Sequence, residues 1–174
     1  WDGLMPVPGD GRYEWQGFLA DDVLPSSLNP IEGWFATANE MNLPVGFPAE
    51  DRKTSFEWTD RSRITRIKSV LSSNPRVSLG DSMALQCDSY SAQSVRLTAL
   101  LRGLSSPQPK VAKALALLKA WDHDANVASA AAAIYEVWAT KHVGKMTVAT
   151  ATPQAAIALV GDGSLEAVIT YLEH

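Results

Sequence analysis

Residues 60–71 read DRSRITRIKSVL, and the character of the chain changes at this stretch. Its apolar residues recur at the spacing of one helix face: Ile64, Ile67, Val70 and Leu71. The pattern stops at Asn74-Pro75, because proline cannot continue a helix and restricts the residue before it. The stretch therefore predicts a helix and places a change of architecture near residue 60.

Before this stretch, turn-forming residues interrupt the chain too often for a long helix. They are Pro6, Pro8, Pro25, Pro30, Pro44 and Pro48, with Gly9, Gly11, Gly17, Gly33 and Gly46 between them. The best strand candidate is Trp34–Ala38, which is entered through Gly33 and left at Asn39. We expect residues 1–60 to form short strands and loops.

After this stretch, helical periodicity dominates. Further helices are expected over residues 83–86, 95–101, 111–121, 127–138 and 165–172, while residues 143–160 show no pattern that can be assigned. Ser78, followed three residues later by Asp81, resembles a capping box at the start of one helix. The fold class expected is mainly α (α+β), with a strand and loop segment at 1–60 and a helical region at 61–174.

Composition excludes several classes of function. The 174 residues carry a net charge of -4 with acidic and basic residues well mixed, so nucleic acid is not an expected partner. No apolar run approaches the roughly 20 residues that span a bilayer, so membrane insertion is not expected either. Cys87 is the single cysteine and is expected to be buried in a helix. A start at Trp1 suggests a processed or excised chain.

No self-contained active site is visible in the residues alone. His123, His142 and His174 lie in unrelated segments without a catalytic motif, and they are interpreted as packing or surface residues. Asp122-His123-Asp124 is too weak a pattern to indicate a metal site. A metal-dependent hydrolase would need ligands that the sequence does not show.

One extended pattern is far more specific. It comprises Pro6-Val7-Pro8-Gly9-Asp10-Gly11, Tyr13-Glu14-Trp15, Gly17-Phe18, Leu24-Pro25, Asn29-Pro30 and Gly33–Asn39, then Trp58, Asp60–Ile64, Leu85-Gln86, Asp88, Leu118, Trp121-Asp122 and Ala131–Trp138. In order and spacing this resembles the β-chain of the penicillin acylase family. The matches span Pro6 to Trp138.

The resemblance implies an N-terminal nucleophile hydrolase of the αββα type, in which a precursor cuts itself and the new N-terminal serine of the β-chain attacks an amide. That serine would lie outside this chain. Asn39 matches the asparagine whose amide helps to form the family's oxyanion hole, and Arg63 matches an arginine near the nucleophile. Without the resemblance, Asn39 would be interpreted as a turn residue and Arg63 as a surface ion-pair partner of Asp60. A shift of two residues in the match would assign the role of Arg63 to Arg61 instead.

The resemblance also implies a structural calcium ion and no organic cofactor. Asp51 matches the position that supplies one carboxylate, with Glu50 as the fallback. A calcium site needs roughly six to eight oxygen ligands, so the others would come from outside this segment.

The expected function is therefore a share in a larger amidohydrolase that cleaves the acyl amide bond of a penicillin, an acyl-homoserine lactone or another linear amide. Its partners would be the remaining α- and β-chain segments and a small acyl-amide substrate, in the periplasm or outside the cell. The alternative is a non-catalytic helical binding or scaffolding module derived from the family. Separated from its complement, the segment is expected to expose apolar surface and to self-associate.

Overall fold

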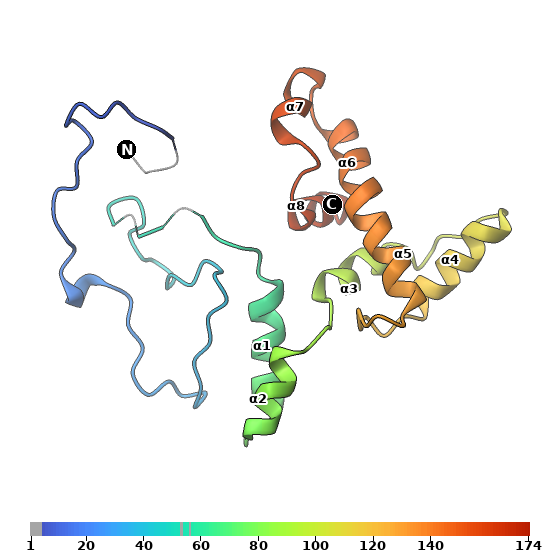
Figure 1. The fold of residues 1–174 in the computed structure, drawn as a ribbon, viewed down its shortest axis with the longest axis horizontal. Coiled ribbons are helices and arrows are strands. Elements are labelled where there is room, and N and C mark those ends of the chain that lie inside the picture. The colour runs from blue at the N-terminus through green and yellow to red at the C-terminus, as the bar shows by residue number, and fades with distance from the viewer. Residues whose placement is uncertain (1–4, 53, 56) are drawn as a thin grey trace. The chain divides into compact units, whose positions relative to one another are not determined.

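The computed structural model describes residues 5–52, 54–55 and 57–174 (Figure 1). The chain divides into two compact units, residues 1–73 and residues 74–174. Within the described ranges, the regular structure is helical, and extended backbone pairs only at the isolated bridge between Tyr90 and Asp124. The prediction of a mainly α chain is confirmed for these residues.

The first unit consists largely of turns and ends in a helix. Its regular elements are the short 3-10 helix η1 (Asp21–Val23) and the helix α1 (Ser62–Ser73), the latter as predicted. Among its described residues only Ala38, Glu40 and Ile64 are buried. Large apolar side chains remain on the surface, among them Trp15, Phe18, Leu28, Ile31, Phe35 and Val45. This unit therefore has almost no hydrophobic core of its own.

The strand expected at Trp34–Ala38 is not formed, so this part of the prediction was wrong. A strand is stable when the N–H and C=O groups of its backbone pair with a neighbouring strand. At Ala38 both groups bind side chains instead: the N–H donates to Glu40, and the carbonyl oxygen accepts from Thr59 and Arg63. The apolar composition was correctly identified, but the described residues provide no partner strand.

The second unit is a helical assembly. Its elements are α2 (Leu79–Gln86), α3 (Ala92–Ala99), α4 (Pro109–Lys119), α5 (Ala130–Trp138), the π-helix η2 (Ala139–Val143), α6 (Gly144–Ala151), η3 (Gln154–Ala156), α7 (Ile157–Val160) and α8 (Leu165–Leu172). Serine side chains cap the N-termini of α2, α3, α5 and α8: Ser78, Ser91, Ser129 and Ser164. At α2 the predicted capping box is confirmed, because Ser78 and Asp81 each bind the other's backbone N–H.

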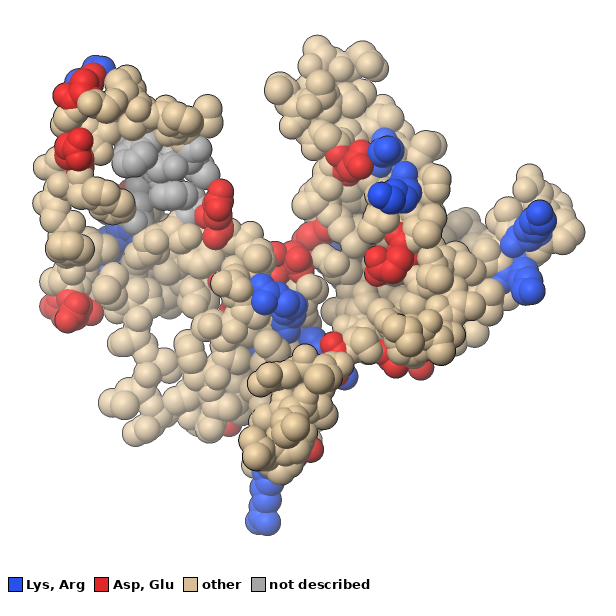
Figure 2. Space-filling view, in the orientation of Figure 1, with Lys and Arg blue, Asp and Glu red and all other residues tan. Residues whose placement is uncertain are grey.

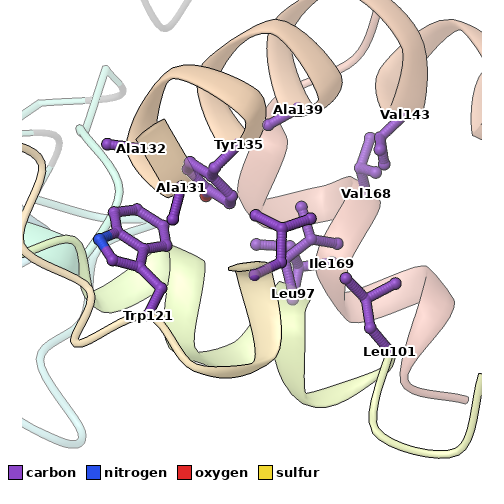
Figure 3. Packing of buried hydrophobic residues seen from close by; sticks show 11 residues of the cluster. Leu97, Leu101, Trp121, Ala131, Ala132, Tyr135, Ala139, Val143, Val168 and Ile169 are labelled. Atoms are coloured by element: carbon purple, nitrogen blue, oxygen red, sulfur yellow. The ribbon is translucent and has the colours of Figure 1, made fainter. Parts of the chain in front are cut away.

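The core of the second unit gathers side chains from α3, α4, α5, η2 and α8 (Figure 3). Ile169 of α8 and Leu97 of α3 lie at its centre with almost no exposed surface. Trp121, just beyond α4, packs against Tyr135 of α5 with ring centroids 5.3 Å apart. Burial raises the pKa of Tyr135 to about 12. The core thus packs α8 against η2 and against α3, which lies much earlier in the chain.

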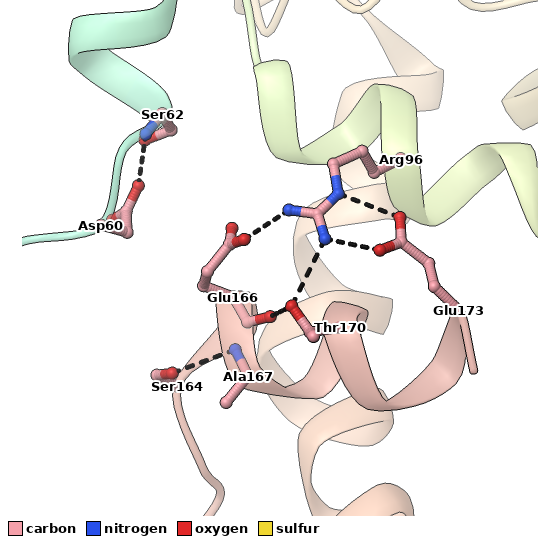
Figure 4. Close-up of polar contacts among 8 residues, drawn as sticks. All are labelled: Asp60, Ser62, Arg96, Ser164, Glu166, Ala167, Thr170 and Glu173. Carbon is pink, nitrogen blue, oxygen red and sulfur yellow. Dashed lines mark hydrogen bonds and ion pairs between the residues drawn. The ribbon is translucent and has the colours of Figure 1, made fainter. Parts of the chain in front are cut away.

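Two polar contacts reinforce the packing of α8 on α3 (Figure 4). Arg96 of α3 lies between two carboxylates of the C-terminal segment and forms ion pairs with Glu166 and Glu173. Its Nε and Nη2 atoms donate to the two oxygens of Glu173 at 2.9 and 2.6 Å. The planar guanidinium thus grips one carboxylate with two bonds, which is the strongest geometry for such a pair.

Cys87 lies at the C-cap of α2 and is exposed, so the expectation of a buried cysteine was wrong. The helix is short and buries none of its residues, because its apolar side chains do not form a continuous stripe. On the face seen in Figure 2, basic and acidic side chains are interspersed among wide uncharged areas. In the described ranges, no helix is long and apolar enough to cross a bilayer.

Gly144 is required where α6 begins beside the loop before α8. A Cβ atom added there would overlap the backbone oxygen of Asp162. We expect Gly144→Ala to lower the free energy of unfolding by about 1–3 kcal/mol, since backbone cannot move aside as a flexible side chain can. Urea denaturation measures the effect. The matched control is Gly103→Ala, where nothing lies within 4 Å of the added atom; equal loss in both variants would contradict the assignment.

Arg96 should make the stability of the second unit pH-dependent. Hydrogen bonding to Arg96 holds the pKa of Glu173 below its ordinary value of 4.5. Between these two pKa values the unfolded chain binds more protons than the folded chain. The ion pair therefore contributes fully to the free energy of unfolding above the ordinary pKa, and this contribution is lost as the pH falls through the lowered pKa of Glu173. We expect Arg96→Met to flatten the decline of the melting temperature below about pH 4.5. Arg102→Met is the control and should leave the decline intact.

Candidate functional site

Asn39 occupies a sharp turn in the first unit. Its φ of 63° lies in the left-handed region, which asparagine enters more readily than most residues. Its neighbours Ala38 and Glu40 are buried, whereas Asn39 itself is exposed. The side chain of Asn39 is therefore presented to the surroundings from an anchored piece of backbone.

Hydrogen bonds from both sides fix the backbone of this turn. The N–H of Ala38 donates to Oε2 of Glu40 at 2.7 Å. Thr59 binds the other side: its N–H donates to the carbonyl oxygen of Asn39 at 2.8 Å, and its hydroxyl donates to that of Ala38 at 3.0 Å. Thr59, which is 20 positions from Asn39 in the chain, is thereby joined to two successive peptide groups of the turn.

Arg63 fixes the side chain of Asn39. Its Nη2 atom donates to the carbonyl oxygen of Ala38 at 2.8 Å and to Oδ1 of Asn39 at 2.9 Å. Arginine has donors only, so it can face the amide through the oxygen and not through the NH2 group. The NH2 group lies on the other arm of the planar amide and is directed away from the guanidinium. Asn39 is thus oriented as a hydrogen-bond donor.

The start of α1 positions Arg63. The carboxylate of Asp60 accepts a hydrogen bond from the backbone N–H of Ser62 at 2.8 Å. Hydrogen bonding to Ser62, with a smaller contribution from the charge of Arg63, keeps the pKa of Asp60 below its usual value. Ile64, the next residue after Arg63, is only 1% exposed and anchors the helix. Arg63 therefore leaves the first turn of a helix that is fixed at both neighbouring positions.

Asp51 lies in a separate turn. Its backbone N–H donates to the carbonyl oxygen of Pro48 at 3.1 Å, and the adjacent Arg52 donates from Nη1 to the carbonyl oxygen of Val23 at 3.1 Å. The carboxylates of Asp51 and of Glu50 are on exposed residues. Among the described residues no group of three or more potential ligands is close enough to hold a metal ion.

A groove of about 510 Å³ lies in the first unit. Its lining residues are Leu24, Pro25, Ser26, Ser27, Phe35, Asn42, Leu43, Pro44, Thr54 and Trp58. Phe35 and Asn42 flank the turn in sequence, and Trp58 immediately precedes Thr59. The groove is mainly apolar, with hydroxyl and amide groups at a few positions.

His123 has a structural environment in the second unit. It lies beyond the end of α4 with a φ of 67°, and its Nδ1 is 2.9 Å from the hydroxyl of Ser94. Burial lowers the pKa of His123, and its ring packs against Trp121. These contacts join α3 to the loop after α4, and they involve none of the residues around Asn39.

The sequence predicted site roles for Asn39 and Arg63, which the structure brings into contact, but it pointed to neither Glu40 nor Thr59. Thr59 carried a usable signal, because it precedes Arg63 by four residues at the point where α1 is approached. Glu40 carried none, since a carboxylate in turn-rich chain usually remains in water. Only the structure reveals that Glu40 is 4% exposed.

Comparison with known proteins gives the family. A profile described as penicillin amidase matches residues 1–171. An acyl-homoserine lactone acylase QuiP from Pseudomonas syringae pv. syringae is 30% identical over 151 residues, covering 78% of this chain and 18% of that protein. The QuiP protein of Pseudomonas putida is 32% identical over 151 residues, with the same 78% and 18% coverage.

Penicillin G acylase from Escherichia coli is 36% identical over 77 residues, which are 44% of this chain and 9% of that enzyme. The chain spans about 18% of the length of the QuiP proteins that it matches. The resemblance noted in the sequence is confirmed by the profile and by these relatives. The chain belongs to the penicillin amidase family.

Proposed function

We propose that this chain contributes the oxyanion-stabilising part of a larger amidohydrolase. The observation that carries the proposal is the contact between Nη2 of Arg63 and Oδ1 of Asn39, because it turns the NH2 group of Asn39 outward as a fixed donor. The nucleophile is an N-terminal serine supplied by another part of the protein. That serine attacks the amide carbonyl, and its own α-amino group accepts the proton.

The geometry suits stabilisation of a developing negative charge. When the serine adds to the carbonyl, the oxygen becomes an oxyanion, and a donor already in position needs no reorganisation. Hydrogen bonds from Ala38 to Glu40 and from Thr59 to Ala38 fix the backbone that carries Asn39. The guanidinium of Arg63 binds both this backbone and the amide oxygen of Asn39.

Acyl amides are the proposed substrates. The matched relatives are named for acyl-homoserine lactones and for penicillin G, both of which contain an acyl group on an amide nitrogen. The mainly apolar groove of the first unit, whose lining includes Phe35 and Trp58, supports a substrate with an apolar acyl group. No redox or nucleotide cofactor is part of the proposal.

The proposal extends to the rest of the protein. The chain covers 18% of the QuiP relatives, and the exposed Trp15, Phe18 and Val45 of the first unit offer apolar surface for other segments of the enzyme. Asp51 is proposed to donate one oxygen to a structural calcium ion whose other ligands come from those segments. We further propose that the enzyme acts in the periplasm or outside the cell.

Asn39→Asp in the full-length protein tests the role of the amide. The carboxylate keeps an acceptor for Arg63 but loses the donor, so we expect kcat to fall by about 10²–10³-fold with little change in melting temperature. Asn39→Gly is the companion variant, because glycine retains the left-handed backbone while removing the side chain, whereas alanine would add backbone strain. Unchanged turnover of an acyl amide in both variants would exclude Asn39 from the oxyanion hole.

Intact mass and N-terminal sequencing of the mature full-length protein test the reaction class. We expect two chains, the larger of which begins with serine and contains the sequence described here. A single uncut chain without amide turnover would contradict the amidohydrolase proposal. That result would favour the alternative, a helical binding module that keeps the sequence of the family without its chemistry.

A further inference from the structure

We propose that Glu40 is a positioning residue that sets the direction of the Asn39 amide by holding the left-handed turn closed. The inference rests on the proposed function of Asn39 and adds a residue that the family resemblance did not point to. Glu40 contacts no reacting atom in this scheme. It acts through the backbone on which Asn39 is mounted.

Glu40 closes the turn at Asn39 through a hydrogen bond to the backbone. Oε2 of Glu40 accepts a hydrogen bond from the N–H of Ala38 at 2.7 Å, so the side chain of one residue closes a ring around the preceding two. Asn39 lies inside this ring with its φ of 63°. Left-handed backbone is disfavoured for L-residues unless surrounding contacts maintain it. The bond from Ala38 to Glu40 is the contact on the N-terminal side of the turn.

The side chain of Glu40 is buried, although it carries a carboxyl group. Glu40 is 4% exposed in a unit where large apolar side chains such as Phe18 remain in solvent. Burying a carboxyl group is unfavourable unless hydrogen bonds compensate for the lost water. Hydrophobic packing does not explain why this glutamate is buried while a phenylalanine is exposed. We therefore attribute the burial of Glu40 to a role in holding the backbone, and its hydrogen bond to the N–H of Ala38 identifies the group that it holds.

Different side chains bind different polar groups of the turn. Thr59 binds the carbonyl oxygens of Ala38 and Asn39, and Arg63 binds the amide oxygen of Asn39. Neither holds the N–H of Ala38, which is the donor that Glu40 binds. Loss of Glu40 would release the Thr37–Ala38 peptide group, so the backbone that carries the Asn39 amide would lose one of its attachments. Misplacement of a reacting group by about 1 Å can lower a rate about 100-fold.

The experiment uses Glu40→Met and Glu40→Gln in the full-length protein, with Glu32→Ala as a control on an exposed acidic residue of the same unit. Methionine retains most of the volume but accepts no strong hydrogen bond, whereas glutamine keeps an acceptor oxygen. We expect Glu40→Met to lower kcat by about 10–100-fold with KM within about twofold, and Glu40→Gln to stay within about threefold of the wild type. Rates are normalised to folded protein by thermal unfolding, and Glu40→Ala replaces the methionine variant if that variant does not fold.

A double variant separates positioning from general destabilisation. If Glu40 acts through Asn39, then Asn39→Asp combined with Glu40→Met should be no slower than Asn39→Asp alone, because the amide to be positioned is already gone. Multiplicative losses would overturn the inference, as would full activity of Glu40→Met or a loss in Glu40→Gln equal to that in Glu40→Met. Normal turnover of Asn39→Asp would instead refute the proposed function itself, whereas a slow Asn39→Asp beside a fully active Glu40→Met would refute only the role of Glu40.

Discussion

The first unit depends on one guanidinium group. Arg63 projects from the first turn of α1 and binds two groups of the Asn39 turn, a backbone carbonyl and a side-chain amide. A unit that buries three of its described residues cannot hold such a turn by hydrophobic packing, so directional hydrogen bonds take over that task. Arginine suits this position because its donors are fixed in one plane and its charge does not titrate. Hydrogen bonds, and not hydrophobic packing, therefore set the geometry of the candidate site.

Periodicity alone predicted the helices where one residue pattern operates without interruption. The helix at residues 60–71 and its end at Asn74-Pro75 followed from apolar spacing and proline, and the capping box at Ser78 was visible three residues apart. The strand at Trp34–Ala38 could not be excluded in this way, since apolar composition does not tell whether a partner strand exists. Its backbone groups bind side chains that are distant in sequence.

Residues 143–160 resisted assignment for a different reason. From Ala131 one series of buried positions recurs every four residues, at Tyr135, Ala139, Val143 and Thr147, beside the buried Ala132, Gly144 and Val148. On an α-helix each such step turns the face by about 40°, so the stripe would wind away from the core. The π-helix η2 has a wider turn and absorbs part of that rotation, so one continuous helical stretch keeps the same side buried. A search for α-helical spacing therefore loses the apolar series before residue 143, and the residues that follow divide among the short elements α6, η3 and α7.

The site residues show the same limit. The roles of Asn39 and Arg63 were predicted through the family pattern, whereas Glu40 acts through a backbone contact that no spacing rule anticipates. The proposed chemistry thus depends on a turn whose supports are ordinary residues in unremarkable sequence. It also lies in the unit with the weaker core.

That imbalance has a consequence for the order in which the protein acquires its structure. The second unit has a core drawn from five of its own elements and can begin to fold as soon as α8 is available. The first unit leaves Trp15, Phe18 and Phe35 in water. If other segments of the enzyme cover this surface, as proposed above, these side chains would be buried only when those segments arrive. During synthesis the Asn39 turn would therefore mature late, and until then its exposed aromatic surface would be a target for molecular chaperones.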